Sequence, residues 1–361
     1  MEMSSVVQQY YDAFSAKYDD RALPGHWKTL QAILRCRTPD SGELHVQCPD
    51  CQHGEWRPLS CGNRHCSKCQ NHEASRWIDK QQTKLLPVPY FMVTFTVPFE
   101  LRTLCWFNQK TVYAMLFSTV DSTLKEFGRN SKDLGGTIGM TMVLYTHSRK
   151  LNFHPHVHVI VPGGAVSRGR RYWKKVKGKY LFHQESLAKV FRARFLEVIG
   201  EAGLILPQGI PTKWVVDCAH VGAGITALKY LSRYLYRSVL CERDIIASKG
   251  GQITFKYVES TSGKTKLRTL PGEDFLWLIL QHVLPRGFRR VRDYGFLHGN
   301  AKKLLSLVQL ILRVIITEVK QRPRPAFKCP CCKSVMKIME FRWMNSRPGF
   351  LIATTGLFTP G

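Results

Sequence analysis

The placement of cysteines constrains this chain more than any other feature. Of the 12 cysteines, five lie between residues 48 and 69 and three between residues 329 and 332. Segment 36–70 has few apolar residues, so it cannot bury a core of its own. It therefore needs a disulfide or a bound metal ion to hold its fold. The N-terminus has no basic stretch followed by an apolar one, so we expect no signal peptide and a cytoplasmic location. In that compartment, clustered CxxC pairs indicate bound metal rather than disulfides.

Two CxxC pairs have the spacing of a structural zinc site. CPDC occupies 48–51 and CSKC occupies 66–69. Four thiolates leave no open coordination position, so we expect structural rather than catalytic Zn²⁺. The predicted ligands are Cys48, Cys51, Cys66 and Cys69. Cys61 and His65 are alternates: either one replaces a member of the four, or the segment binds a second ion.

A further half-site lies near the C-terminus, at CPCC, 329–332. Cys329 and Cys332 form one CxxC pair, and Cys331 is extra. No second pair follows it in the chain. Two interpretations stay open: the pair binds metal with a partner from elsewhere, or it has no metal role.

The charge balance indicates a polyanionic partner. Lys and Arg total 53 against 26 Asp and Glu, which gives a formal net charge of +27. Nucleic acid and an anionic membrane surface are the two candidates. The most apolar stretch, 304–316, is short and interrupted by polar residues, so it is not expected to span a bilayer. We therefore expect a nucleic-acid partner and no membrane partner. The oligomeric state is left open, a homo-oligomer included.

Strand and helix patterns alternate in a way that predicts an α+β fold built on an antiparallel sheet. Segments rich in aromatic and β-branched residues predict strands at 90–97, 137–145, 156–161 and 213–218. Helical periodicity is found at 1–35, 71–86, 104–127, 184–202, 224–240, 272–283 and 299–320, and a hairpin is predicted at 252–270.

The same patterns suggest three domains. We expect residues 1–88 to form an N-terminal helical and zinc-binding domain, and residues 89–250 to form the domain that carries the histidine and tyrosine motifs described below. Residues 251–361 form a basic, largely helical region with a hairpin and the second cysteine cluster.

Two histidines lie close together on one predicted strand, in FHPHVHVIV at 153–161. Because side chains alternate between faces, His156, His158 and Ile160 share one face and the valines between them the other. Two imidazoles side by side on a rigid strand can bind a divalent ion such as Mg²⁺ or Mn²⁺. His154 has the same parity, but we expect Pro155 to end the regular strand before it. The alternative is a histidine pair without metal.

A tyrosine-rich helix is predicted at 224–240 (GITALKYLSRYLYRSVL). On a helix, Leu228, Leu231, Leu235 and Val239 form one apolar stripe. Tyr230 and Tyr234 lie together on the opposite side, and Tyr236 points elsewhere. Arg233 and Arg237 lie beside the two tyrosines and are candidate DNA-binding residues. A phenol needs activation to attack, and nearby cations favour the phenolate. The alternative is an amphipathic helix whose tyrosines cover a second packing surface.

Two basic segments are candidate DNA-binding surfaces, because cations pair with phosphates and bases stack on aromatic rings. The first segment, 284–297, has Arg286, Arg289, Arg290 and Arg292 interleaved with Phe288, Tyr294 and Phe296. The second, 168–179, contains Arg170, Arg171, Lys174 and Lys175 with Tyr172 and Trp173. The alternative for either is a solvated surface loop.

In this order, these motifs resemble the IS91-type transposases, within the HUH superfamily of single-strand endonucleases. The segment from ILRCRTPDSGELHVQCPDC to SCGNRHCSKCQ is similar to the family's N-terminal zinc-binding domain. HPHVHVIVPGG is similar to its two-histidine motif, and KYLSRYLYR to its YxxxY motif. LPRGFRRVRDYGFL, at 284–297, is similar to a further family signature. The resemblance covers most of the chain and implies an HUH-type central sheet flanked by helices.

The resemblance also implies a rolling-circle-like transposition mechanism in the bacterial cytoplasm. His156 and His158 would hold the catalytic Mg²⁺ or Mn²⁺, and Tyr230 and Tyr234 would be the nucleophiles. The partners would be single-stranded DNA and element-end DNA, cut through a 5′-phosphotyrosine. Two alternatives remain: a replication initiator or relaxase-type nickase with the same chemistry, and a non-catalytic zinc-containing DNA-binding protein.

Overall fold

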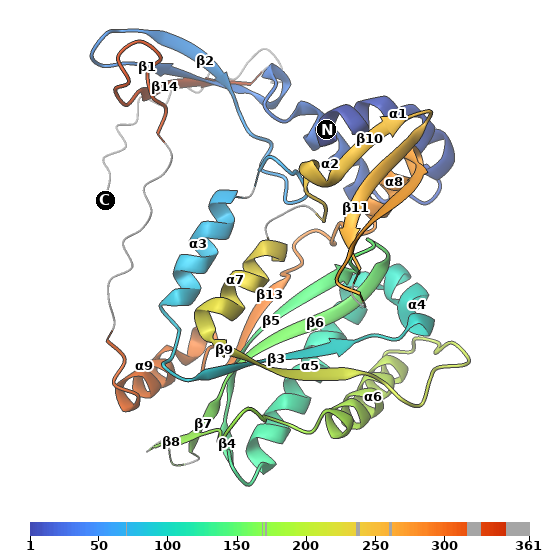
Figure 1. Cartoon of the computed structure of the whole chain (residues 1–361), viewed down its shortest axis with the longest axis vertical. Helices are drawn as coiled ribbons and strands as arrows, with labels where there is room; N and C mark the ends of the chain where they lie inside the picture. Colours follow the sequence, from blue (N-terminus) through green and yellow to red (C-terminus); the bar gives the residue numbers. More distant parts are fainter. Residues whose placement is uncertain are drawn as a thin grey trace.

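The computed structural model describes residues 1–69, 71–167, 169, 172–235, 239–259, 262–315 and 326–343, with backbone only at 71–73 and 233–235. Its centre is a five-stranded sheet in the order β13-β5-β6-β3-β9, in which every neighbouring pair is antiparallel (Figure 1). The strands are β13 (Val291–Gly295), β5 (Gly139–His147), β6 (Phe153–Pro162), β3 (Pro89–Thr96) and β9 (Val216–Ala223). The predicted α+β class with an antiparallel sheet is confirmed.

Helices cover both faces of this sheet. On one face, Val157 and Val159 of β6 pack into a core with α5 (Gln109–Asn130) and α6 (Gln184–Glu201). On the other, Ile160 packs with Leu228 and Leu231 of α7 (Gly224–Leu235), which lies beside α3 (Asn71–Gln82). The alternation predicted for β6 therefore separates a valine face from the face that carries the histidines.

Pro155 does not end the strand as we predicted, because β6 begins at Phe153. Between Tyr145 and His147 of β5 the register with β6 shifts, which places an extra residue on the β6 side. A β-bulge is one of the few sheet positions where the missing N–H of proline is tolerated. His154 is consequently part of the same strand as the two metal-ligand candidates.

Several predicted helices are shorter than expected. Helix α7 is described as far as Leu235, residues 236–238 lie outside the described part, and Val239, predicted on the same helix, packs with a second core instead. Helix α9 (Lys302–Ile311) ends because Arg313 adopts a φ of 53° and the N–H of Val314 returns to the carbonyl of Gln309. This left-handed C-terminal turn satisfies carbonyls that the helix would otherwise leave open.

The second core joins the N-terminal helices to the segment 239–283. It contains Phe14 from α1 (Met3–Tyr18), Leu30 from α2 (Pro24–Arg35), Phe255 from β11 and Phe275 from α8. The remaining elements here are β10 (Ile245–Lys249), β11 (Gln252–Val258), β12 (Thr265–Pro271) and α8 (Gly272–Leu280). This core crosses the predicted domain boundaries at 88 and 250, because residues far apart in sequence share one apolar cluster.

The middle of the cysteine-rich segment, residues 43–58, forms a small ribbon that stands apart from the central sheet (Figure 1). Its strand order is β14-β1-β2, from β14 (Lys337–Arg342), β1 (Glu43–Gln47) and β2 (Gly54–Pro58). A strand near the C-terminus thus pairs with one near the N-terminus. The remaining helices and strands are α4 (Arg102–Phe107), β4 (Gly136–Thr137), β7 (Gly164–Ser167) and β8 (Trp173–Lys175). Among the described helices, none has the length and apolarity that crossing a membrane requires.

Candidate nuclease site and cysteine clusters

The two histidines of β6 lie side by side in the middle of the central sheet. His156 pairs with Thr96 of β3 and Tyr145 of β5, and His158 pairs with Thr94 of β3. The two imidazole centroids are 4.9 Å apart. Strand pairing on both sides holds the backbone, so the imidazoles project from a rigid platform.

Hydrogen bonds orient both rings. The Nδ1–H of His156 donates to the carbonyl oxygen of His154 at 2.7 Å, and Nδ1 of His158 lies 3.0 Å from the hydroxyl of Thr94. With Nδ1 engaged in this way, the Nε2 side of each ring is the one suited to a metal. Burial lowers the pKa of His156 to about 4 and that of His158 to about 3. Both rings are therefore neutral near pH 7, as a metal ligand must be.

A third ligand does not join this pair among the described side chains. Among the described residues, groups of three or more His, Cys, Asp or Glu side chains that could hold a metal occur at two places. Both groups consist of cysteines, and neither includes His156 or His158. His154 lies next along the strand, with its ring centroid 5.1 Å from that of His156, but its Nδ1 contacts the guanidinium of Arg102.

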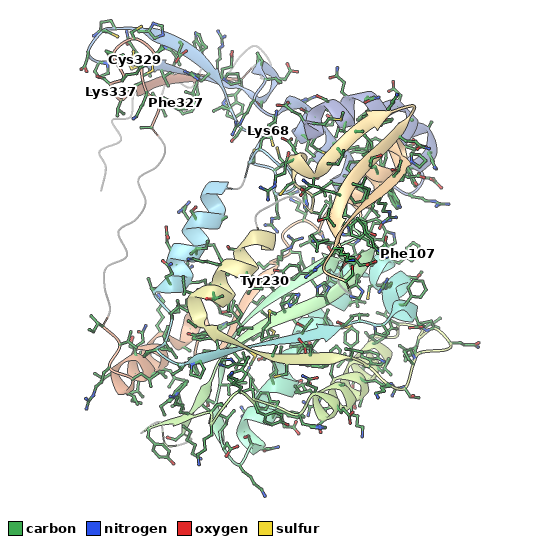
Figure 2. All side chains as sticks on the ribbon, in the orientation of Figure 1. Lys68, Phe107, Tyr230, Phe327, Cys329 and Lys337 are labelled. Atoms are coloured by element: carbon green, nitrogen blue, oxygen red, sulfur yellow. The ribbon has the colours of Figure 1, made fainter. Side chains whose placement is uncertain are left out.

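Helix α7 brings a tyrosine to the histidines. The ring of Tyr230 lies 6.2 Å from that of His158, at 75° to it, and Figure 2 shows it where α7 faces the sheet. Tyr145 connects the two elements: its ring is 4.7 Å from that of His158, and its hydroxyl donates to the carbonyl of Leu231 at 3.4 Å. Tyr234 lies one turn beyond Tyr230, but its side chain is outside the described part.

Several predicted residues of this helix cannot be placed. The side chain of Arg233 is not described, and Tyr236 and Arg237 fall outside the described residues. The structure therefore places one of the two candidate nucleophiles, Tyr230, near the histidine pair.

The four predicted zinc ligands do not form one cluster. Cys66 and Cys69 group with Cys36 and Cys61, and all four ligand atoms lie within 4.8 Å of one another. In this group, the sulfur of Cys69 is 3.5 Å from that of Cys36 and 3.6 Å from that of Cys61. Cys61 is thus a cluster member. Cys36 was missed, because it is a single cysteine that follows α2 and belongs to no CxxC pair.

Cys48 and Cys51 group instead with Cys329 and Cys332. The physical reason is strand pairing: β1 leads directly into the first CxxC turn and pairs with β14, which follows the second. His65 belongs to neither cluster; it is buried, and burial together with the nearby Arg290 lowers its pKa to about 3.

Comparisons with known proteins identify the family of this chain. The family model described as "Transposase zinc-binding domain", of the IS91 type, matches residues 6–97, and the one described as "Putative transposase" matches residues 139–304. The chain belongs to the IS91 family of transposases. The putative transposase y4qJ of Sinorhizobium fredii (strain NBRC 101917 / NGR234) is 29% identical over 331 residues, 85% of this chain and 83% of that protein. The transposase for insertion sequence element IS801 of Pseudomonas savastanoi pv. phaseolicola is 25% identical over 359 residues, 92% of this chain and 85% of that protein.

The two family matches divide the candidate site residues of this transposase between them. The match at 139–304 includes both histidines and Tyr230. The match at 6–97 includes all of the Cys36 cluster but only Cys48 and Cys51 of the other. The zinc-binding family and the cysteine clusters together support structural Zn²⁺ in this transposase, and its family makes it a DNA-processing enzyme.

The basic segment 284–297 of the transposase is not the aromatic DNA-binding loop we predicted. Phe288 and Phe296 are buried in the two cores on either side of the sheet, so they cannot stack on bases. Arg290 is buried, and Arg292 lies over the ring of Phe117 at 4.3 Å. The cause is β13, which pairs with β5 and makes this segment the edge of the central sheet.

Four predicted DNA-binding residues are open to a partner. Arg286 and Arg289 are exposed at the start of the first segment, Lys175 is exposed on β8, and Lys174 is half-buried. In the second segment Tyr172 is exposed, whereas Trp173 packs against Phe296. Arg170 and Arg171 lie outside the described residues.

Proposed function

We propose that this transposase nicks and rejoins single-stranded DNA at the ends of its element, with Tyr230 and Tyr234 as nucleophiles. The observation that carries the proposal is the placement of Tyr230 on α7, with its ring 6.2 Å from the imidazole of His158, which is one of two neutral imidazoles side by side on β6. Mg²⁺ or Mn²⁺ held by Nε2 of His156 and His158 would polarise the scissile phosphate and stabilise developing charge. The net charge of +27 supports a DNA substrate.

The chemistry is an in-line displacement at phosphorus. One tyrosine releases its phenolic proton to solvent, and its oxygen forms a bond to the scissile phosphorus. The bond from phosphorus to the 3′ oxygen breaks, and that oxygen takes up a proton from solvent. One DNA end becomes a free 3′-OH, and the other a 5′-phosphotyrosine, so the energy of the phosphodiester is kept for rejoining. The i, i+4 spacing places Tyr234 one helical turn from Tyr230. A second strand can then be attacked while the first stays covalently held.

We also propose a structural role for the cluster of Cys36, Cys61, Cys66 and Cys69, which would bind one Zn²⁺ through four thiolates. Cys36, Cys66 and Cys69 are buried in the core formed with α1 and α2. That position suits a closed structural site. The zinc would fasten the N-terminal helices to the chain that leads into α3.

A covalent-adduct assay tests the nuclease proposal. The purified chain is mixed with single-stranded oligonucleotides from both element ends, with Mg²⁺ or Mn²⁺, and resolved on a denaturing gel. A slow-migrating adduct is expected that EDTA prevents. The double variant Tyr230→Phe, Tyr234→Phe should lose the adduct yet retain DNA binding, because only the hydroxyl groups are removed.

The same assay separates the alternatives. If DNA binds but no adduct forms with any divalent ion, the chain is a non-catalytic DNA-binding protein and the proposal is wrong. If the adduct forms on replication-origin sequences and not on element ends, the chemistry stands but the biological substrate is that of a replication initiator or relaxase.

A further inference from the structure

We infer that Cys48, Cys51, Cys329 and Cys332 form a second zinc site, which fastens the C-terminal segment onto the N-terminal ribbon. Two of its ligands lie far outside the matched zinc-binding domain, which ends at residue 97. The inference goes beyond the proposed nuclease function and does not depend on it. Figure 2 labels Cys329 in the ribbon, well away from Tyr230.

The sulfur positions suit a tetrahedral metal. The Cys48 sulfur is 3.4 Å from that of Cys332, and the Cys51 sulfur is 3.4 Å from that of Cys329 and 3.6 Å from that of Cys332. Four sulfurs at about 2.3 Å from Zn²⁺ are separated by about 3.8 Å. A disulfide would need about 2.05 Å. The four thiols therefore surround a common centre without being bonded in pairs.

The backbone of the two CxxC turns is the same. The N–H of Cys48 donates to the carbonyl of His53 at 2.8 Å, and the N–H of Cys329 donates to that of Ser334 at 2.9 Å. In each turn, the N–H of the fourth residue after the first cysteine returns to that cysteine's carbonyl, at 3.1 Å for Gln52 and 3.0 Å for Lys333.

Both turns also share an unusual conformation. Gln52 has a φ of 61° and Lys333 a φ of 64°. Non-glycine residues adopt this left-handed region infrequently and at an energetic cost. Two segments remote in sequence adopt it at equivalent positions, which turns both sulfurs of each pair toward the same point. This is the geometry that a four-thiolate site requires from two facing turns.

The ribbon has too little core to hold this shape alone. Its buried cluster consists of Leu44, Val46, Cys48, Cys329 and Met336. Along β14, every residue is exposed. The far end of the ribbon is closed by Arg342, which pairs with Glu43 at 2.6 Å and lies over the ring of Trp56 at 3.9 Å. A module with so small a core needs a metal ion to stabilise its other end, and the cysteine cluster lies at that end.

Zinc content of the full-length chain tests the inference. Mass spectrometry of the protein purified with zinc should find two Zn²⁺ per chain. Cys329→Ser/Cys332→Ser and Cys48→Ser/Cys51→Ser should each leave one. The quadruple variant should also leave one, because both pairs hold the same ion. Cys331→Ser is the matched control: this thiol lies between the two ligands in sequence but outside the cluster, so two Zn²⁺ should remain.

The zinc that stays in the Cys36 cluster reports that each variant has folded. One Zn²⁺ in the unmodified chain that is retained in Cys329→Ser/Cys332→Ser, two in Cys329→Ser/Cys332→Ser, or a greater loss in the quadruple variant than in either double variant would overturn the inference. Loss of all zinc in both double variants would also overturn it, because the sites would not be separate. None of these outcomes bears on tyrosine chemistry, which the adduct assay measures independently.

Discussion

The ring of Tyr145 stacks on the imidazole of His156, with centroids 5.4 Å apart and planes 22° from parallel. The same side chain donates from its hydroxyl to the carbonyl of Leu231 on α7. One residue of β5 therefore contacts a metal-ligand candidate and the helix that carries the candidate nucleophiles. From these two contacts we expect Tyr145 to position α7 relative to the histidine pair.

Tyr145→Phe should reduce adduct formation several-fold while DNA binding stays unchanged. The ring and its contact with His156 remain, but the hydrogen bond from its hydroxyl to the carbonyl of Leu231 on α7 is lost. A hydrogen bond of this kind contributes about 0.5–1.5 kcal/mol. Single-turnover cleavage at saturating DNA measures the effect. Equal losses of binding and cleavage would contradict a positioning role.

Thr94→Val should weaken the apparent affinity for Mn²⁺ about 10- to 100-fold, because the hydroxyl that orients His158 is removed at nearly constant volume. The measurement is the Mn²⁺ concentration that gives half-maximal adduct. Thr96→Val is the matched control, since Thr96 lies two residues along β3 and its side chain makes no hydrogen bond within the described residues. The same shift in both variants would argue against an orienting hydrogen bond.

The two zinc sites should release metal at different rates. Cys51 and Cys332 are exposed, whereas three of the four thiols in the Cys36 cluster are buried. A chromogenic chelator added to the native protein should therefore remove one Zn²⁺ quickly and the other slowly. In Cys329→Ser/Cys332→Ser, only the slow phase should remain. Release of both Zn²⁺ ions in a single kinetic phase from the unmodified chain would contradict the expected difference in rate.

His282→Gln should make stability less dependent on pH. His282 is buried, donates from Nε2 to the carbonyl of Leu151 at 2.9 Å, and burial lowers its pKa to about 3. The unfolded imidazole titrates near 6.5, so between pH 6.5 and 3 the unfolded chain binds the extra proton, and stability falls as the pH falls. Each such group contributes a slope of about 1.4 kcal/mol per pH unit within that window.

Urea unfolding of the zinc-loaded protein between pH 5 and 6.5 measures that slope. Glutamine keeps an amide donor and acceptor but does not titrate. The slope of unfolding free energy against pH should therefore be smaller in the variant, by about 1.4 kcal/mol per pH unit. The value at pH 7.5 gives the cost of the substitution itself. An unchanged slope would show that the imidazole also charges in the folded chain.

Gly295→Ala should destabilise the chain strongly, by more than about 2 kcal/mol. Gly295 has a φ of 60°, and a Cβ there would overlap the carbonyl oxygen of Ile138, which is backbone and cannot move aside easily. Gly287→Ala is the control: its φ is 77°, but nothing lies within 4 Å of the added carbon. The control variant should lose only about 1–2 kcal/mol of unfolding free energy, which is the cost of a left-handed backbone conformation at alanine. Thermal unfolding compares the two, and equal losses would contradict the close packing of β13 on β5.

The local sequence pattern was sufficient to predict those features that depend on a single helix or strand. The alternation through 153–161 separated the histidine face from the valine face, because side chains alternate in any strand. Helical spacing likewise placed Leu228 and Leu231 in the core. The net charge and the order of the motifs were enough to predict the DNA-processing family that the comparisons show.

Only the tertiary structure decided which distant segments meet. A CxxC pair determines a turn with two thiols, but its partner depends on strand pairing, and β1 pairs with β14 from the other end of the chain. The basic segment 284–297 was misread for the same reason: whether an interleaved aromatic is buried depends on β13 joining the sheet edge. Short-range spacing carries no information about either pairing, because the free energy that selects it comes from apolar surface and metal ligands contributed by remote residues.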